Sequence, residues 1–143
     1  MALSELRVGE FLAALGEKTP APASGAATAL TAALAAALVE LAGRFAGDEP
    51  SVVRAKTLWS RLSELADEDS EAYAAFMADR NEQTRARIVA VPGEIASCAD
   101  EIAALAEHVR VQLNSSVVGD AEAAGELARA AARVARRLAE LNA

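Results

Sequence analysis

The 143-residue chain has few of the residues from which disulfides, metal sites and aromatic binding surfaces are built. Its one cysteine, Cys98, excludes an internal disulfide, and together with one histidine, His108, it is too little for a His/Cys metal cluster. Aromatic residues make up only 3% of the chain, and alanine and leucine supply most of its apolar content. Because Ala and Leu lose least free energy on entering a helix, we expect an all-α protein.

The chain has no excess of positive charge, and its one long uncharged stretch contains prolines near its start. Its net charge is −7, and such a surface repels nucleic acid and anionic lipid, so we expect no nucleic acid and no membrane as a partner. The start, MALSELRVGEF, lacks the cationic segment and apolar run of a signal peptide. The uncharged stretch from Thr19 to Val39 contains two prolines and leaves too few continuous helical residues to cross a bilayer. We therefore expect a cytoplasmic protein in which this stretch begins a central helix.

The spacing of apolar residues predicts five helices in a single domain, 1–143, at about residues 4–15, 24–46, 51–80, 92–113 and 117–141. Ser4 is the expected N-cap of the first helix, and Pro92 suits the first turn of the fourth, after the polar segment DRNEQTRAR. Long helices joined by short turns predict an up-and-down bundle. Alanine-rich faces leave much area to cover, so we expect a homodimer.

Two aspartates occupy positions that helical spacing reserves for apolar side chains. The expected third helix has an apolar stripe whose one missing position is Asp69, and the fifth has a stripe whose missing position is Asp120. The stripes are Ala55, Leu58, Leu62, Leu65, Ala72 and Phe76, and Val117, Ala124, Leu127, Ala131, Val134, Leu138 and Leu141. Asp69 could instead be a buried acid paired with an arginine, or lie on a helix face less dry than the stripe suggests, and Asp120 could be an N-cap after Gly119. If both are buried and face one cleft, raised carboxyl pKa values would suit proton transfer.

Other candidates have a structural as well as a functional interpretation. Tyr73 follows Asp69 by one helical turn and either binds a ligand or packs at the rim. Asn114 is expected to close the fourth helix as a left-handed cap, His108 to lie at a rim, and Cys98 to be an inert core thiol. The cluster of Arg80, Arg85 and Arg87 is either a solvated loop or a site for the carboxylates of an acidic ligand.

Several short motifs follow one another in a recognisable order. Phe11-Leu12 precedes the turn Pro20-Ala21-Pro22-Ala23-Ser24-Gly25 and an alanine-rich helix; then come Asp69, Tyr73 and Phe76, and finally Pro92, Asn114 and Gly119-Asp120. Over nearly the whole chain, this order resembles the cyclodeaminase/cyclohydrolase family, which includes the folate-handling domain of formiminotransferase-cyclodeaminase. In that family the turn is Pro-x-Pro-Gly-Gly-Gly-Ser, an acid precedes an aromatic pair, and a Ser-Asp step begins the last helix.

The resemblance implies an all-helical homodimer that acts on tetrahydrofolate derivatives with no bound cofactor and no metal. The reaction would be ring closure of 5-formimino-tetrahydrofolate with loss of ammonia, or reversible hydration of the 5,10-methenyl form. Asp69 and Asp120 would be the general acid/base candidates, with Asn114, Tyr73 and the turn residues Ser24 and Gly25 binding substrate. From their charge, we expect Arg85 and Arg87 to meet the glutamate tail.

The chain also departs from the family pattern. The glycine run survives only as Ala23-Ser24-Gly25, and the two added Cβ atoms would crowd any ligand that approached the backbone there. The family's Asn-Val-x-x-Asn-Leu ending becomes Arg137-Leu138-Ala139-Glu140-Leu141-Asn142, without the first asparagine. The alternative hypothesis is therefore a non-catalytic helical homologue that serves as an assembly or small-ligand-binding module.

Overall fold

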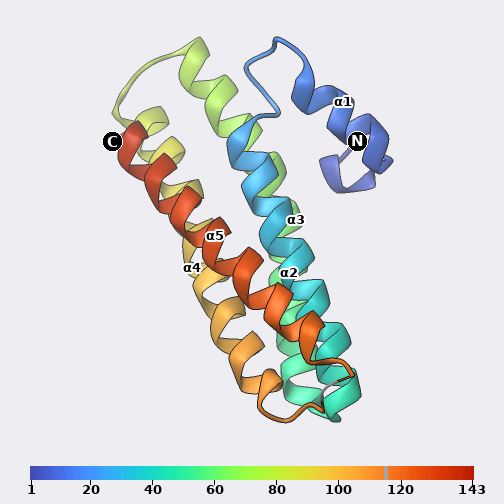
Figure 1. Ribbon diagram of the computed structural model, residues 1–143. Helices are drawn as coiled ribbons and strands as arrows, with labels where there is room; N and C mark the ends of the chain where they lie inside the picture. Colours follow the sequence, from blue (N-terminus) through green and yellow to red (C-terminus); the bar gives the residue numbers. More distant parts are fainter. Residues whose placement is uncertain (115) are drawn as a thin grey trace.

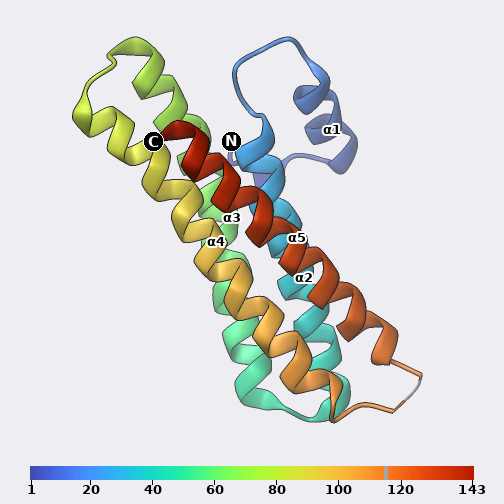
Figure 2. The ribbon, with the colours of Figure 1, turned by 60° about the vertical axis from the view of Figure 1, so that its left-hand side comes forward.

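The structure is a computed structural model that describes residues 1–114 and 116–143, and its ordered elements there are all helical. Helices α2 to α5 run up and down in one elongated bundle, while α1 stands apart from it beside the start of α2 (Figure 1, Figure 2). The elements are the short 3-10 turn η1 (Leu3–Glu5), α1 (Val8–Gly16), α2 (Ser24–Ala46), α3 (Glu49–Ala78), α4 (Glu82–Arg110) and α5 (Val118–Asn142). The all-α fold with five helices and an up-and-down bundle is thus confirmed, and the bundle itself consists of α2 to α5.

Helix α4 begins well before Pro92, so the prediction of a polar connecting segment there was wrong. Its start is fixed by a reciprocal cap: Asn81 Oδ1 accepts from the Thr84 amide at 2.9 Å, and Thr84 Oγ1 accepts from the Asn81 amide at 3.0 Å. Pro92 lies inside the helix and is buried. As a consequence Arg85 and Arg87 are helical residues, and their side chains leave α4 in different directions.

The first helix also begins later than predicted. Ser4 lies in η1, and α1 starts at Val8, where the Glu10 carboxylate accepts a 2.9 Å hydrogen bond from the Arg7 amide. The Leu3 amide donates to Asp67 Oδ1 at 2.9 Å, which ties η1 to α3. The chain is therefore attached to the bundle on both sides of α1, although α1 itself projects from it (Figure 1).

The core is built on the alanine face of α2. Six of its alanines have no exposed surface: Ala26, Ala29, Ala32, Ala35, Ala36 and Ala42. Small side chains let neighbouring helices approach closely, so α3, α4 and α5 pack against this face. On the opposite side of α2, Leu34 and Phe45 are 64% and 65% exposed. Although α2 is long and apolar enough to span a membrane, half of its most apolar window is buried inside the bundle.

The predicted apolar stripe of α5 is rotated away from the real one. The buried side consists of small residues, Ala121, Ala124, Gly125, Ala128, Ala131, Ala132 and Ala135. Leu127, Val134 and Leu141 are exposed. Spacing alone cannot choose between two apolar faces, and close packing against α2 and α4 selects the smaller side chains. Asp120 is therefore half-buried beside the core and not in the middle of it.

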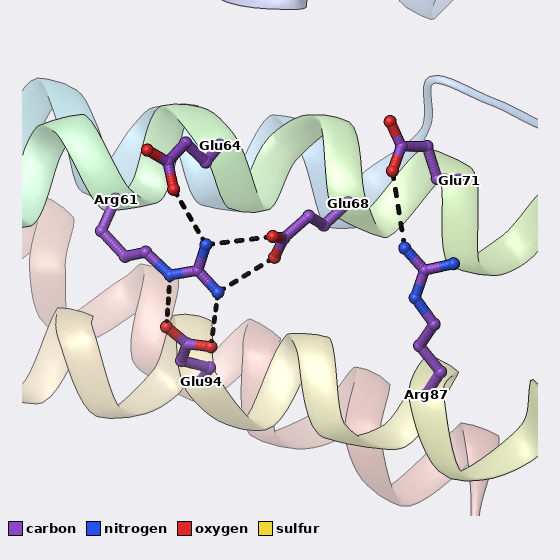
Figure 3. Close-up of polar contacts among 6 residues, drawn as sticks. All are labelled: Arg61, Glu64, Glu68, Glu71, Arg87 and Glu94. Carbon is purple, nitrogen blue, oxygen red and sulfur yellow. Dashed lines mark hydrogen bonds and ion pairs between the residues drawn. The ribbon is translucent and has the colours of Figure 1, made fainter. Parts of the chain in front are cut away.

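Ion pairs set the register of α3 against α4. Arg61 on α3 binds Glu94 on α4, with Nε and Nη2 donating at 2.6 and 2.9 Å, and it also contacts Glu64 and Glu68 on its own helix at 3.0 Å (Figure 3). Arg54 pairs with Glu101 between the same two helices. These contacts hold the following part of α3, which contains Asp69 and Tyr73, in place against α4.

Candidate functional site

A small cavity lies where the start of α2, the last turns of α3, the first turns of α4 and the end of α5 meet. Its volume is about 220 Å³, and it is lined by Pro20, Ala21, Ala23, Ser24, Gly25, Asp69, Tyr73, Ile88, Leu138 and Asn142. Four of the predicted site residues, Ser24, Gly25, Asp69 and Tyr73, are thus brought together from two helices. The turn before α2 forms one wall, and its Ala21–Pro22 peptide bond is cis.

The carboxyl of Asp69 lies directly over the backbone of Gly25. A Cβ atom on residue 25 would overlap all three carboxyl atoms of Asp69, so this contact requires glycine at that position. Residues 23 and 24 carry side chains without closing the cavity, since both line it. Of the three glycines in the family's run this chain keeps one, Gly25, and it is Gly25 that the Asp69 carboxyl contacts.

The surroundings of Asp69 alter its ionisation. Burial raises the pKa of Asp69 above its ordinary value, because the charged form loses hydration in the cavity wall. No arginine or lysine within the described ranges forms an ion pair with it, so the alternative of a paired buried acid was wrong. An unpaired carboxyl beside a cavity can take up and release a proton nearer to neutral pH than an exposed one can.

The first turn of α2 offers hydrogen-bond donors to the same space. Its N-cap is Ala23, whose side chain cannot accept a hydrogen bond, so no side chain caps the first amides of the helix. The Ser24 carbonyl accepts a 2.6 Å hydrogen bond from Thr28 Oγ1. Uncapped amides at a helix start favour a negative or carbonyl oxygen, and here they border the cavity.

Asn142 is a lining residue that was not predicted as a site residue. Its Nδ2 donates to the Ile88 carbonyl at 2.8 Å, which holds the end of α5 against α4 and fixes the side-chain amide at the cavity wall. Its position in the family-like ending of the sequence was visible, but nothing in the local pattern placed that ending next to Asp69.

Asp120 and Asn114 lie at the opposite end of the bundle. Eighteen residues of α5, about 27 Å at roughly 1.5 Å per residue, separate Asp120 from the cavity residue Leu138. Asp120 is also not an N-cap, because α5 begins at Val118 with Val117 as its N-cap. Asn114 is not a left-handed cap, since no described residue except glycine has positive φ; instead its Oδ1 accepts from the Ser116 amide and hydroxyl at 3.0 and 2.6 Å.

The two predicted arginines have different surroundings. Arg85 stacks on Phe76, and its Nη1 donates to the Asn142 carbonyl at 3.4 Å, beside the cavity. Arg87 contacts the Glu71 carboxylate at 3.5 Å between α3 and α4 (Figure 3). Only Arg85 is therefore attached to a residue of the cavity wall.

The remaining candidates lie outside the cavity. His108 Nε2 is 3.2 Å from Asp48 Oδ2 near the end of α4, and its side chain is exposed. Cys98 is buried, and burial raises the pKa of its thiol, as expected of an inert thiol. Within residues 1–114 and 116–143, no three His, Cys, Asp or Glu side chains are placed to hold a metal ion together.

Comparison with known proteins relates the chain to one family. Residues 7–143 match the sequence profile of formiminotransferase-cyclodeaminase. The chain also resembles the crystal structure of formiminotetrahydrofolate cyclodeaminase from Thermotoga maritima, with a TM-score of 0.92 and 22% sequence identity, over 98% of this chain and 79% of that one. This second likeness is one of fold. No curated protein sequence matches the chain.

The contact between Gly25 and Asp69 predicts a specific effect of a single methyl group. Gly25→Ala should push the carboxyl out of the cavity wall and lower the free energy of unfolding by about 1–3 kcal/mol, measured by urea denaturation. Gly93→Ala is the matched control, because a Cβ there meets nothing within 4 Å and should stabilise α4 by about 0.5–1 kcal/mol. Adding Asp69→Ala to Gly25→Ala should recover part of the loss; strictly additive effects would show that the two residues do not touch.

The raised pKa of Asp69 predicts how stability depends on pH. Between the ordinary pKa and the raised one, the folded protein holds a proton that the unfolded chain releases. The contribution of Asp69 is therefore full below the ordinary pKa and is lost as pH rises through the raised one. Asp69→Asn should remove this loss, so the variant should be at least as thermally stable as the wild type at pH 7 and gain less on acidification. A variant clearly less stable at pH 7 would contradict the assignment.

Proposed function

Because the chain belongs to the formiminotransferase-cyclodeaminase family, we propose that it is an enzyme acting on a tetrahydrofolate derivative that carries a one-carbon group. The two candidate reactions are ring closure of 5-formimino-tetrahydrofolate with loss of ammonia and reversible hydration of 5,10-methenyl-tetrahydrofolate. The observation that carries the proposal is the unpaired Asp69 carboxyl, held over Gly25 in the wall of a cavity.

Both candidate reactions pass through a tetrahedral carbon and require a proton to move. In the cyclodeaminase reaction, N10 of the folate attacks the carbon of the formimino group, whose nitrogen is protonated, and a new N10–C bond forms as the C=N π bond breaks. The Asp69 carboxylate accepts the N10 proton and returns it to the formimino nitrogen, which leaves as ammonia when its bond to carbon breaks. Asp69 is a carboxylate again at the end of the reaction. Its raised pKa makes it a stronger base than an ordinary aspartate and brings its pKa closer to neutral pH, where a general acid/base is most effective.

The cavity has the size to hold one end of the substrate. At about 220 Å³ it is smaller than the roughly 300–1,000 Å³ typical of pockets for larger ligands, so it suits the ring system and leaves the rest of the folate outside. The uncapped amides at Ser24 and Gly25 and the Tyr73 hydroxyl would orient the ring. Asp120 and Asn114, at the far end of the same chain, would not reach it.

The alternative is a non-catalytic homologue for assembly or ligand binding. It is favoured by the separation of Asp120 and Asn114 from Asp69, which leaves the cavity with one of the two expected aspartates.

Turnover of folate substrates tests the enzyme proposal. Purified protein should consume 5,10-methenyl-tetrahydrofolate, or release ammonia from the 5-formimino compound, faster than buffer alone. Asp69→Asn should reduce the rate by at least about a hundredfold, the usual contribution of a general acid/base. Asp120→Asn is the matched control and should retain activity. A rate equal to that of buffer would favour the non-catalytic alternative, and loss of activity in Asp120→Asn alone would overturn the assignment to Asp69.

We also propose that two copies associate through the leucine face of α2. An apolar groove of about 570 Å³ lies between α1 and the bundle; besides the α1 side chains, it is lined by Leu30, Ala33, Leu34 and Ala37 of α2 and by Trp59 of α3. Further along α2, beyond the groove, Leu41 and Phe45 are also exposed. A contiguous apolar face along one straight helix is self-complementary about a two-fold axis, so a second copy is the occupant that fits it.

A charge on this face should separate the copies. Leu34→Glu should convert a dimer into a folded monomer in sedimentation velocity, because a carboxylate cannot be buried there without a partner. Val111→Glu, at an exposed residue beyond the end of α4, is the matched control and should leave the mass unchanged. A wild-type monomer at micromolar concentration, or a Leu34→Glu dimer, would contradict the proposal.

A further inference from the structure

Two arginines meet at one aromatic ring beside the cavity. The guanidinium carbon of Arg80 lies 5.3 Å from the centre of the Phe76 ring, and that of Arg85 lies 5.2 Å from it. Arg80 follows the end of α3, and Arg85 is in the first turn of α4. Stacking on the ring favours each cation, but it also gathers two positive charges around one side chain, an arrangement that a negative group bound to both would stabilise.

Neither of these arginines has a carboxylate partner within the described ranges. Arg80 contacts only the Met77 sulfur, at 3.5 Å, and Arg85 only the Asn142 carbonyl. The nearby Asp79 carboxylate accepts from Asn81 Nδ2 at 3.1 Å. By contrast, eight other arginines are in ion pairs: Arg44, Arg54, Arg61, Arg87, Arg110, Arg129, Arg136 and Arg137. Arg7 and Arg133 also lack an ion pair among the described residues, but they do not share a ring with another arginine, as Arg80 and Arg85 do.

This pair lies near the cavity without lining it. Phe76 is one turn after Tyr73 on α3, and Arg85 is one turn before Ile88 on α4, and both Tyr73 and Ile88 line the cavity. Arg85 also bonds to the main chain of Asn142, a third lining residue. A ligand that filled the cavity and extended outward past Tyr73 would therefore reach Phe76 and the two guanidinium groups.

We propose that Arg80, Phe76 and Arg85 form a carboxylate-binding site for the acidic tail of the substrate. The inference rests on the proposed function, since it is the folate that carries a benzoyl spacer and a glutamate beyond its ring system. The ring of Phe76 holds both guanidinium planes, and their remaining N–H groups donate to the tail carboxylates. Arg87 has no part in this site, because Glu71 already neutralises it (Figure 3).

Binding of two stable ligands tests the site. One is 5-formyl-tetrahydrofolate, which carries the glutamate, and the other is 6-methyl-tetrahydropterin, which has the ring system alone. By titration calorimetry, Arg80→Ala and Arg85→Ala should each lower the affinity for 5-formyl-tetrahydrofolate about tenfold or more and leave the affinity for the pterin unchanged. The effect should shrink as salt is raised. Arg87→Ala is the matched control, and it should alter neither affinity.

The outcomes separate this inference from the function on which it rests. If the wild type binds neither ligand, the proposed function fails. If the wild type binds 5-formyl-tetrahydrofolate and the Arg80 and Arg85 variants bind it equally well, the function stands and the carboxylate site is refuted. A loss of affinity for both ligands alike would show that the arginines only hold the turn between α3 and α4, and would also refute the site.

Discussion

The close approach of α2 to its neighbours, made possible by alanine, is the constraint on which the rest of the structure depends. Alanine faces on α2 and α5 have no long side chains to interdigitate, so the helix backbones come together. The start of α2 is thereby brought against α3, and the Asp69 carboxyl reaches the Gly25 backbone. A bundle packed on leucine would hold these helices further apart and leave no such contact.

The candidate site is assembled from helix ends that are distant in the sequence. The first turn of α2 supplies uncapped amides, α3 supplies Asp69 and Tyr73, and the end of α5 is attached to α4 through Asn142 and Ile88. The Arg61 ion pairs fix the register of α3 against α4 (Figure 3). Because each wall comes from a different helix, the geometry of the cavity depends on the whole bundle, and a change far from Asp69 can alter it.

Part of this arrangement could be predicted from the sequence. Composition indicated the all-α bundle. The gap in the apolar stripe of α3 identified Asp69, because the stripe residues on either side of it, Leu65 and Ala72, are both buried on the same face of the helix. The same argument failed for Asp120, because α5 has two apolar faces and packing chose the alanine one. Pro92 led to a wrong start for α4, because the cap formed by Asn81 and Thr84 begins the helix ten residues earlier, at Glu82. The meeting of Asn142 and Arg85 with the cavity depends on tertiary packing that spacing does not encode.

The chain's single tryptophan lies at an informative place. Trp59 Nε1 donates to Glu40 Oε1 at 2.9 Å, a bond that lowers the pKa of Glu40, and the indole forms part of the wall of the apolar groove. Whatever covers that groove must exclude water from the only indole in the molecule. The intrinsic emission wavelength of the protein is therefore a built-in optical reporter of that surface, read without any label.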